Sequence, residues 1–255
     1  MTLRKLRQEL RPLASPVRAR VSQSFFKTGP GEYGAGDRFI GLTVPQIRRL
    51  AKQCRQLSLP ETKQLLQSPI HEERLLALLI LVGKFAAEDD AGRQLLYATY
   101  LRNTRFINNW DLVDSSAEHI VGAFLRSCSG ASVKRRLVGQ KKLALRRSAA
   151  TTLLKLARSQ SLWERRIAII ATFHFIKRGE FAPTLRIGRQ LLRDREDLIH
   201  KAVGWMLREV GKRDSPTAEK FLRMHYRRMP RTMLRYAIER LPERRRQCYL
   251  KGTIN

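Results

Sequence analysis

A tryptophan and an aspartate one helical turn apart stand out in the segment 108–116, which reads NNWDLVDSS. Because Trp110 and Asp114 are four residues apart, they share one face of a helix. A carboxylate in that place could stabilise a developing positive charge, and an indole face could pack against a cationic or sugar-like group. A structural interpretation is also open, in which Asp111 or Asp114 complements the helix dipole and Trp110 is a hydrophobic anchor.

Two further segments place aromatic and cationic side chains on helices. In the segment KAVGWMLRE, Trp205 has Lys201 one turn before it and Arg208 almost one turn after it, so its helix face is half cationic. An aromatic side chain between cations suits contact with a nucleic acid. In the segment LWERRIA, the adjacent Arg165 and Arg166 point to different sides of their helix, so only one of them can face a ligand.

The chain is strongly basic, with 51 Lys plus Arg against 22 Asp plus Glu and a formal net charge of +29. Residues 119–163 contain ten Lys and Arg, including Lys142 and Arg147, and no Asp or Glu. Such a stretch repels itself unless an anion binds, and a nucleic acid is the natural partner because its condensed counterions are then released. An anionic membrane surface is the alternative, but the basic residues form no single amphipathic anchor. We therefore predict that Lys142, Arg147, Lys201 and Arg208 contact DNA.

Several other classes of protein do not fit the sequence. The longest apolar run, residues 75–82, has 8 residues, against the roughly 20 that span a membrane. The five His are isolated from one another, the three Cys are widely spaced, and no Gly-x-Ser-x-Gly occurs. The sequence therefore predicts no metal site, no disulfide framework and no serine nucleophile. Because residues 1–14 lack the apolar core and cleavage site of a secretory signal, we expect a cytoplasmic protein.

Apolar side chains recur at the i, i+3, i+4 and i+7 spacing of amphipathic helices along nearly the whole chain, which predicts an all-α fold. Residues 28–37, TGPGEYGAGD, contain four Gly and one Pro and must form a loop. This loop lacks the Gly-Lys-Ser/Thr of a phosphate-binding loop, and a simple connection between helices is the other interpretation. The predicted helices cover residues 2–12, 15–27, 44–56, 60–68, 71–87, 91–107, 111–128, 131–142, 144–158, 162–178, 181–194, 196–212, 215–228 and 231–248.

The second half of the chain repeats itself with a period in the mid-thirties. The segment 164–173 aligns with 199–208 at an offset of 35 residues, and a related segment at 235–238 follows after another 34. Helix pairs at this spacing are typical of an α-solenoid of HEAT-like repeats, here with a concave basic DNA-binding face. A non-repetitive helical bundle is the alternative. We predict one HEAT-like repeat domain over residues 1–255, of which 1–68 form a less regular N-terminal cap.

Three segments carry a resemblance to a known family: WDLVD at 110–114, WERR followed by Ile-Ala at 163–168, and KAVGWMLRE at 201–209. In order and spacing they are similar to the AlkD-like DNA alkylation repair glycosylases, a family of HEAT-like repeat proteins that excise alkylated purines. The segment FIGLTVP at 39–45 also resembles the N-terminal region of that family.

The resemblance implies roles for individual residues. The catalytic carboxylate of the family, the second Asp of its Trp-Asp-x-x-Asp motif, falls on Asp114. The two tryptophans that flank the backbone of the lesion match Trp110 and Trp205. The arginine that grips the phosphate and supports the carboxylate matches Arg166.

An aromatic residue that lines the cleft near the N-terminus in the family corresponds to Phe25 or Phe26. We assign Phe25 to DNA binding and leave its role relative to Phe26 open.

The resemblance also implies a reaction, namely excision of N3- and N7-alkylpurines from double-stranded DNA in base excision repair. Such a base is already cationic and leaves readily, so a carboxylate and two indole faces suffice, and no metal or organic cofactor is needed. We expect a monomer without an obligate protein partner, associated with the bacterial nucleoid. Two alternatives stay open: a non-catalytic HEAT-repeat protein that binds branched or distorted DNA, and a helical-repeat scaffold for acidic proteins or RNA.

Overall fold

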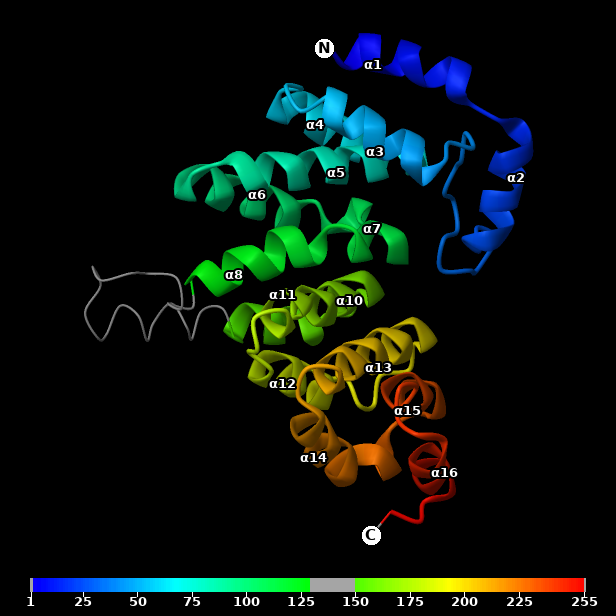
Figure 1. The fold of residues 1–255 in the computed structure, drawn as a ribbon. Coiled ribbons are helices and arrows are strands. Elements are labelled where there is room, and N and C mark those ends of the chain that lie inside the picture. The colour runs from blue at the N-terminus through cyan, green and yellow to red at the C-terminus, as the bar shows by residue number, and fades with distance from the viewer. Residues whose placement is uncertain (1, 129–149, 255) are drawn as a thin grey trace. The chain divides into compact units, whose positions relative to one another are not determined.

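The computed structural model describes residues 2–128 and 150–254. These residues form helices and connecting turns, with one isolated bridge between Arg38 and Ile70 and no strand in the two ranges. The predicted all-α class is therefore confirmed. Within the same ranges, no helix is both long and apolar enough to span a bilayer. The chain divides into two compact units, unit 1 with residues 1–116 and unit 2 with residues 117–255 (Figure 1), and the prediction of a single domain stays a prediction.

Unit 1 is built from consecutive helices joined by short connections, with one longer connection between α2 and α3. That connection, residues 26–43, is not helical and contains the glycine-rich segment, as predicted. The elements of unit 1 are α1 (Leu3–Leu10), a 3-10 turn (Arg11–Leu13), α2 (Pro16–Phe25), α3 (Val44–Gln53), α4 (Leu59–Leu66), α5 (His71–Ala87), α6 (Asp90–Arg102), a second 3-10 turn (Thr104–Phe106) and α7 (Trp110–Asp114).

Polar caps fix the starts of several helices. Thr43 accepts a hydrogen bond from the backbone of Gln46 at the start of α3, and the Gln46 side chain accepts one from the backbone of Thr43. These two bonds satisfy backbone N–H groups that have no partner within the helix. The helix start predicted at residue 44 is therefore confirmed, as is the one predicted at residue 215, where Asp214 accepts a hydrogen bond from Thr217.

The centre of unit 1 is α5, most of whose residues are buried. Its apolar run from Leu75 to Leu81 packs against α3 and α4, and α5 also contacts α6 and α7. Burial of a large apolar side chain stabilises a fold by about 1.5–3 kcal/mol, so this helix is the main anchor of the unit. Because α5 begins at His71, its first turn carries a polar ring into the interior beside α7.

Unit 2 begins with a π-helical turn and continues through paired helices. Its described elements are the π turn (Glu118–Gly122), α8 (Ala123–Cys128), a helical stretch at residues 150–157, α10 (Leu162–Ala171), α11 (Phe173–Ile176), α12 (Ala182–Gln190), α13 (Asp197–Gly211), α14 (Ser215–His225), a 3-10 turn (Tyr226–Arg228), α15 (Arg231–Ala237) and α16 (Glu243–Lys251).

The repeat predicted from the sequence is visible in unit 2. The helices α10, α13 and α15 begin at Leu162, Asp197 and Arg231, which are 35 and 34 residues apart. In Figure 1 they follow one another, and α13 packs against both of the others. A Cβ on Gly204 would lie 2.5 Å from the carbonyl oxygen of Met233, so glycine permits the close approach of α13 to α15. Stacking of this kind is that of an α-solenoid with HEAT-like repeats.

Three predicted helices are interrupted. The α-helix predicted over 111–128 is interrupted after Asp114, where the Ser116 hydroxyl donates a hydrogen bond of 2.6 Å to the Leu112 carbonyl. The helix predicted over 162–178 is interrupted at Thr172, whose hydroxyl donates a hydrogen bond of 2.7 Å to the Ile169 carbonyl. These side chains compete with the backbone for the carbonyl groups that continue a helix. The helix predicted over 231–248 is two helices, because the residue before Pro242 is disfavoured in helical conformation.

Candidate active site around the α7 turn

The predicted Trp-Asp motif forms the single helical turn α7. Leu112 and Val113 are fully buried in unit 1 and draw the turn against the core. Trp110, Asp111 and Asp114 are half-buried on the remaining sides. The prediction that Trp110 and Asp114 lie on one helical turn is confirmed, since the helix runs from the first of them to the second.

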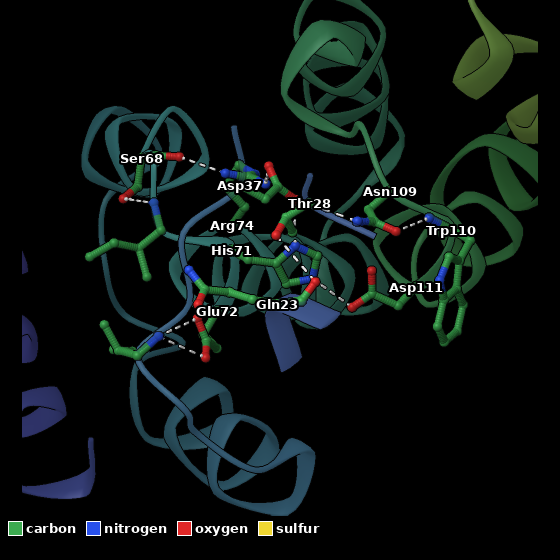
Figure 2. Close-up of polar contacts among 12 residues, drawn as sticks. Gln23, Thr28, Asp37, Ser68, His71, Glu72, Arg74, Asn109, Trp110 and Asp111 are labelled. Atoms are coloured by element: carbon green, nitrogen blue, oxygen red, sulfur yellow. Dashed lines mark hydrogen bonds and ion pairs between the residues drawn. The ribbon is translucent and has the colours of Figure 1, made fainter. Parts of the chain in front are cut away.

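The other carboxylate of the turn, Asp111, is bound to a buried histidine. The Nε2 of His71 lies 2.8 Å from Asp111, and its Nδ1 lies 2.9 Å from Asp37. Figure 2 shows the His71 ring between these two carboxylates. The second oxygen of Asp37 accepts a hydrogen bond of 2.6 Å from Arg74, which also donates to the Ser68 carbonyl. We call Asp37, His71, Arg74 and Asp111 the buried relay.

The surroundings of the buried relay shift two pKa values. Burial disfavours the charged ring of His71, but its hydrogen bonds to Asp111 and Asp37 and the charge of Asp111 outweigh burial and raise the pKa of His71 above its usual value. Burial alone would raise the pKa of Asp37, but the His71 hydrogen bond and the charge of Arg74 lower that pKa overall. Both groups are thus biased toward their charged forms.

Aromatic rings surround the relay and Trp110. The Phe26 ring stacks on Trp110 at a centroid distance of 5.3 Å and on Phe39 at 5.1 Å, and Phe39 stacks on His71 at 4.5 Å. Phe25 meets the Trp110 ring edge-on at 5.9 Å and is 62% exposed. Phe26 therefore supports the indole from within, whereas Phe25 is the exposed aromatic beside it, and its assignment to DNA binding stays a prediction.

The glycine-rich segment brings Asp37 to the relay. A Cβ on Gly34 would lie 2.4 Å from the carbonyl oxygen of Phe26 and 3.3 Å from Nδ2 of Asn109, the cap of α7. Only glycine fits this approach of the segment to the C-terminal end of α2, and it also lets the segment lie beside the cap of α7. The Glu72 carboxylate then holds the continuing chain against α5, because it accepts hydrogen bonds from the backbone of Ile40 and Gly41 at 3.1 and 2.7 Å.

The C-terminal end of α7 is held by a buried tyrosine. The Tyr100 hydroxyl lies 2.9 Å from the Ser116 hydroxyl, which itself bonds the carbonyl of Leu112. Burial raises the pKa of Tyr100, the Ser116 hydrogen bond opposes this, and the charge of Asp114 adds to the increase. Asp114 thus lies close enough to this hydroxyl pair to affect its proton.

In unit 2, the two adjacent arginines point to different partners, as predicted. Arg165 binds Asp194 at 2.6 Å and also donates to backbone carbonyls of the preceding turn. Arg166 is buried and donates to the carbonyl of Leu198 in the first turn of α13. The two arginines therefore bind different partners, Asp194 for Arg165 and the first turn of α13 for Arg166.

Trp205 is half-buried on α13 beside Phe173, whose ring centroid is 5.9 Å away. Its predicted cationic neighbours both contact carboxylates: Lys201 pairs with Asp197 at 2.8 Å, and Arg208 pairs with Glu239. If either cation contacts a phosphate, it therefore exchanges its present carboxylate partner for that phosphate.

The structure tests the predicted site residues unequally. Trp110 and Asp114 belong to unit 1, and Arg166 and Trp205 to unit 2, so the concave DNA-binding face expected from the sequence stays a prediction. The predicted DNA-binding residues Lys142 and Arg147 lie outside the described residues. Over the described part of the chain, no three His, Cys, Asp or Glu side chains form a group that could hold a metal ion.

The sequence interpretation missed His71, Asp37 and Arg74. The relay joins residues 34 and 40 positions apart, so no local spacing marks it. The available signal was indirect: a histidine and an arginine in the first turn of an otherwise apolar helix, and an aspartate at the end of a glycine-rich loop.

Comparison with known proteins agrees with the fold and identifies a family. The family model described as DNA alkylation repair enzyme matches residues 6–241. A solved structure described as a predicted DNA alkylation repair enzyme from Enterococcus faecalis is 15% identical, covers 90% of this chain and 97% of its own, and superposes with a TM-score of 0.64. At that identity the likeness shows the fold. No curated protein is significantly similar to the chain. The match over nearly the whole length shows that the chain belongs to the DNA alkylation repair enzyme family.

Proposed function

We propose that the protein is a DNA glycosylase that excises N3- and N7-alkylpurines from duplex DNA. Membership of the family supports a role in alkylation repair with DNA as the partner. The observation that carries the proposal is the placement of a carboxylate and an indole on one short helical turn. Trp110 begins α7 and Asp114 ends it, and both side chains are half-buried. A carboxylate and an indole four residues apart are suited to a sugar that develops positive charge.

In the proposed reaction, the bond between C1′ of the deoxyribose and the purine nitrogen breaks, and its electron pair leaves with the base. A purine alkylated at N3 or N7 carries a positive charge, so it departs as a neutral molecule. The sugar develops oxocarbenium-like charge in the transition state, which the Asp114 carboxylate stabilises. Water then adds to C1′ and gives a proton to Asp114, and the products are the free base and an abasic site.

The remaining predicted residues supply binding in this proposal. Arg166 grips the phosphate beside the lesion through its planar guanidinium, which matches phosphate geometry. The indoles of Trp110 and Trp205 pack against the sugar and the cationic base. The basic residues contact the flanking backbone and, with the exposed aromatic Phe25, complete the proposed interface: Lys142, Arg147, Lys201 and Arg208.

The test is release of 7-methylguanine and 3-methyladenine from methylated duplex DNA, measured in single-turnover reactions with and without EDTA. Wild type releases both bases in either buffer, because no step in the proposal passes through a metal ion. Asp114→Asn binds the DNA as tightly or more tightly, because it removes a carboxylate that repels phosphates, and releases neither base. Asp90→Asn, which changes an exposed aspartate of α6, behaves as wild type.

Two outcomes would contradict the proposal. Equal excision by wild type and Asp114→Asn would remove Asp114 from the reaction. Tight, salt-sensitive binding by wild type without release of either base would favour a non-catalytic protein that binds branched or distorted DNA.

A further inference from the structure

Both ring nitrogens of His71 face carboxylates. Nδ1 is 2.9 Å from an oxygen of Asp37 and Nε2 is 2.8 Å from an oxygen of Asp111. An ionised carboxylate only accepts hydrogen bonds, and a neutral imidazole has one N–H to donate. Both contacts are therefore hydrogen bonds only when the ring carries two protons and a positive charge.

The charges around the ring lead to the same protonation state. Asp37 comes from the glycine-rich segment, Asp111 from α7, and Arg74 from α5. The Glu72 carboxylate, also on α5, accepts hydrogen bonds from the backbone of Ile40 and Gly41. The rings of Phe26 and Phe39 also pack against the His71 ring. Two aspartates against Arg74 and a charged His71 give a neutral buried group, whereas a neutral ring would leave one negative charge uncompensated.

Asp111 depends on this proton most. Its Oδ2 receives the His71 hydrogen bond, and its Oδ1 is buried and has no hydrogen-bond partner in the described part of the chain. Asp37 has Arg74 and Asn109 as further donors, at 2.6 and 3.4 Å. Loss of one of the two His71 ring protons would thus leave the Asp111 charge, with its Oδ1 buried, without a neutralising cation, and α7 would move away from α5 to let the carboxylate reach water.

The turn that carries Asp111 has little stability of its own. The five residues of α7 form about one turn, and an isolated turn of helix does not persist in water. Besides the buried Leu112 and Val113, the turn is held by the Asn109 contact with Asp37 and the Asp111 contact with His71. These two contacts tie α7 to the glycine-rich segment and to α5, and both end on the buried relay.

We propose that His71, held as an imidazolium between Asp37 and Asp111, is a positioning residue that fixes the α7 turn and with it the directions of Trp110 and Asp114. This inference rests on the proposed function for its consequence in catalysis. His71 does not touch the substrate; it acts through Asp111 on the two residues that do. The raised pKa of His71 supports the charged form at neutral pH.

A first experiment needs no activity. The ring ¹⁵N signals of the histidines are recorded between pH 5 and 9, and that of His71 is assigned from its absence in His71→Gln. Both nitrogens of His71 stay protonated at pH 7, where an ordinary histidine is mostly neutral. A His71 ring with one unprotonated nitrogen at pH 6 would overturn the inference. Should His71→Gln fail to fold, replacing each of the other four histidines in turn assigns the same signal by elimination.

The second experiment follows the position of the indole. The difference between the fluorescence of wild type and of Trp110→Phe isolates Trp110 from the other two tryptophans. This difference spectrum changes with pH at the midpoint of the His71 titration, and in Asp111→Asn it is independent of pH over that range. A wild-type spectrum that stays constant while His71 loses its proton would contradict the positioning role.

The third experiment concerns excision. His71→Gln lowers the single-turnover rate of 7-methylguanine release by roughly 10- to 100-fold, as misplacement of a catalytic group does, and changes the DNA Kd by less than about 2-fold because it contacts no phosphate. The wild-type rate falls as pH rises through the pKa of His71, and the rate of His71→Gln does not. His119→Gln, at an exposed position, behaves as wild type.

The outcomes separate the inference from the proposed function. If wild type releases no base, the glycosylase proposal fails, and the ring protonation and the Trp110 spectrum still decide whether His71 positions α7. If wild type is active and His71→Gln keeps both its rate and its pH profile, the positioning role is wrong and the glycosylase stands.

Discussion

Arg166 and its neighbour Arg165 bind different partners, so replacing each of them separately tests which one contacts DNA. Arg166→Ala weakens DNA binding and excision together, and Arg166→Lys recovers only part of the loss because an ammonium cannot bind a phosphate in a bidentate way. Arg166→Ala also removes the side-chain hydrogen bond to the Leu198 carbonyl, which costs about 0.5–1.5 kcal/mol of stability. The measurements are the DNA Kd and the single-turnover rate at a temperature where urea unfolding shows each variant folded.

Arg165→Ala is the matched control for this pair. It breaks the ion pair with Asp194 and lowers stability by a similar mechanism, but it leaves the rate of the folded protein unchanged. A larger loss of excision in Arg165→Ala than in Arg166→Ala would show that the two arginines are assigned the wrong way round.

The two adjacent phenylalanines of unit 1 lead to opposite expectations. Phe25 is 62% exposed, so Phe25→Ala changes the free energy of unfolding by less than about 0.5 kcal/mol. Phe26 stacks on Trp110 and Phe39 and packs against the His71 ring, so Phe26→Ala costs roughly 2–4 kcal/mol. If Phe25 binds DNA as predicted, its replacement weakens binding of methylated duplex about 5-fold or more, the value of one aromatic contact. Unfolding and binding titrations on both variants check this, and unchanged DNA affinity of Phe25→Ala would exclude the role.

At the scale of elements, the approach of the glycine-rich segment to the C-terminal end of α2 sets a steric limit. A side chain at Gly34 meets the Phe26 carbonyl oxygen at 2.4 Å, so Gly34→Ala shifts the segment and lowers stability by about 1–3 kcal/mol. Gly83 in α5 has only ordinary contacts around its Cβ position, and Gly83→Ala is neutral or stabilises by up to about 1 kcal/mol. Urea unfolding compares the two; equal destabilisation by both replacements would refute the steric argument.

The helices that could be predicted are those whose signals are local. Amphipathic spacing, the caps at Thr43 and Asp214, and the offset of 35 residues between the second-half repeats all lie within a single stretch of chain, and the structure confirms them. The breaks at Ser116 and Thr172 escaped prediction because their hydroxyls bond nearby carbonyls only after the chain has begun to turn. A sequence window does not distinguish such a serine from one on a helix surface.

The candidate site was predicted in part for the same reason. The types and spacing of Trp110 and Asp114 suggested a carboxylate beside an indole, and the turn between them is helical. The different roles of Asp111 and Asp114 could not be read from the sequence, since they depend on His71, which is 40 residues earlier. Contacts of this separation are set by the packing of α5 against α7 and leave no periodic signal.

At the scale of the whole molecule, the two units and the charge of +29 set the conditions of any measurement. Each unit has its own buried core, so urea unfolding can show two transitions, and a single free energy of unfolding would then be undefined. Probes in each unit are therefore needed: Trp110 reports on unit 1, and Trp163 and Trp205 report on unit 2. The buried relay belongs entirely to unit 1, so its contribution is expected in the transition that Trp110 reports.

The contribution of His71 to the free energy of unfolding decreases as pH rises. The pKa of His71 is raised in the folded protein, by hydrogen bonds to Asp111 and Asp37 that outweigh burial, so the folded state holds the proton more tightly than the unfolded state. The stabilisation is complete below the unfolded pKa of about 6.5 and is lost as pH rises through the folded pKa. Over that window the stability advantage of wild type over His71→Gln falls by at most about 1.4 kcal/mol per pH unit.

The difference in the free energy of unfolding between wild type and His71→Gln isolates the contribution of His71. His174, whose pKa is lowered to about 3 by burial and by Arg178 and other nearby cations, contributes a stability change of the opposite sign below pH 6.5, and it is present in both. Urea unfolding of wild type and His71→Gln at half-unit steps from pH 6 to 9, followed through Trp110, measures the difference directly. An advantage of wild type that stays constant or grows with pH would mean that His71 is neutral in the folded protein. In that case the ring would donate to one aspartate alone, and the other contact would need its proton on Asp37 or Asp111.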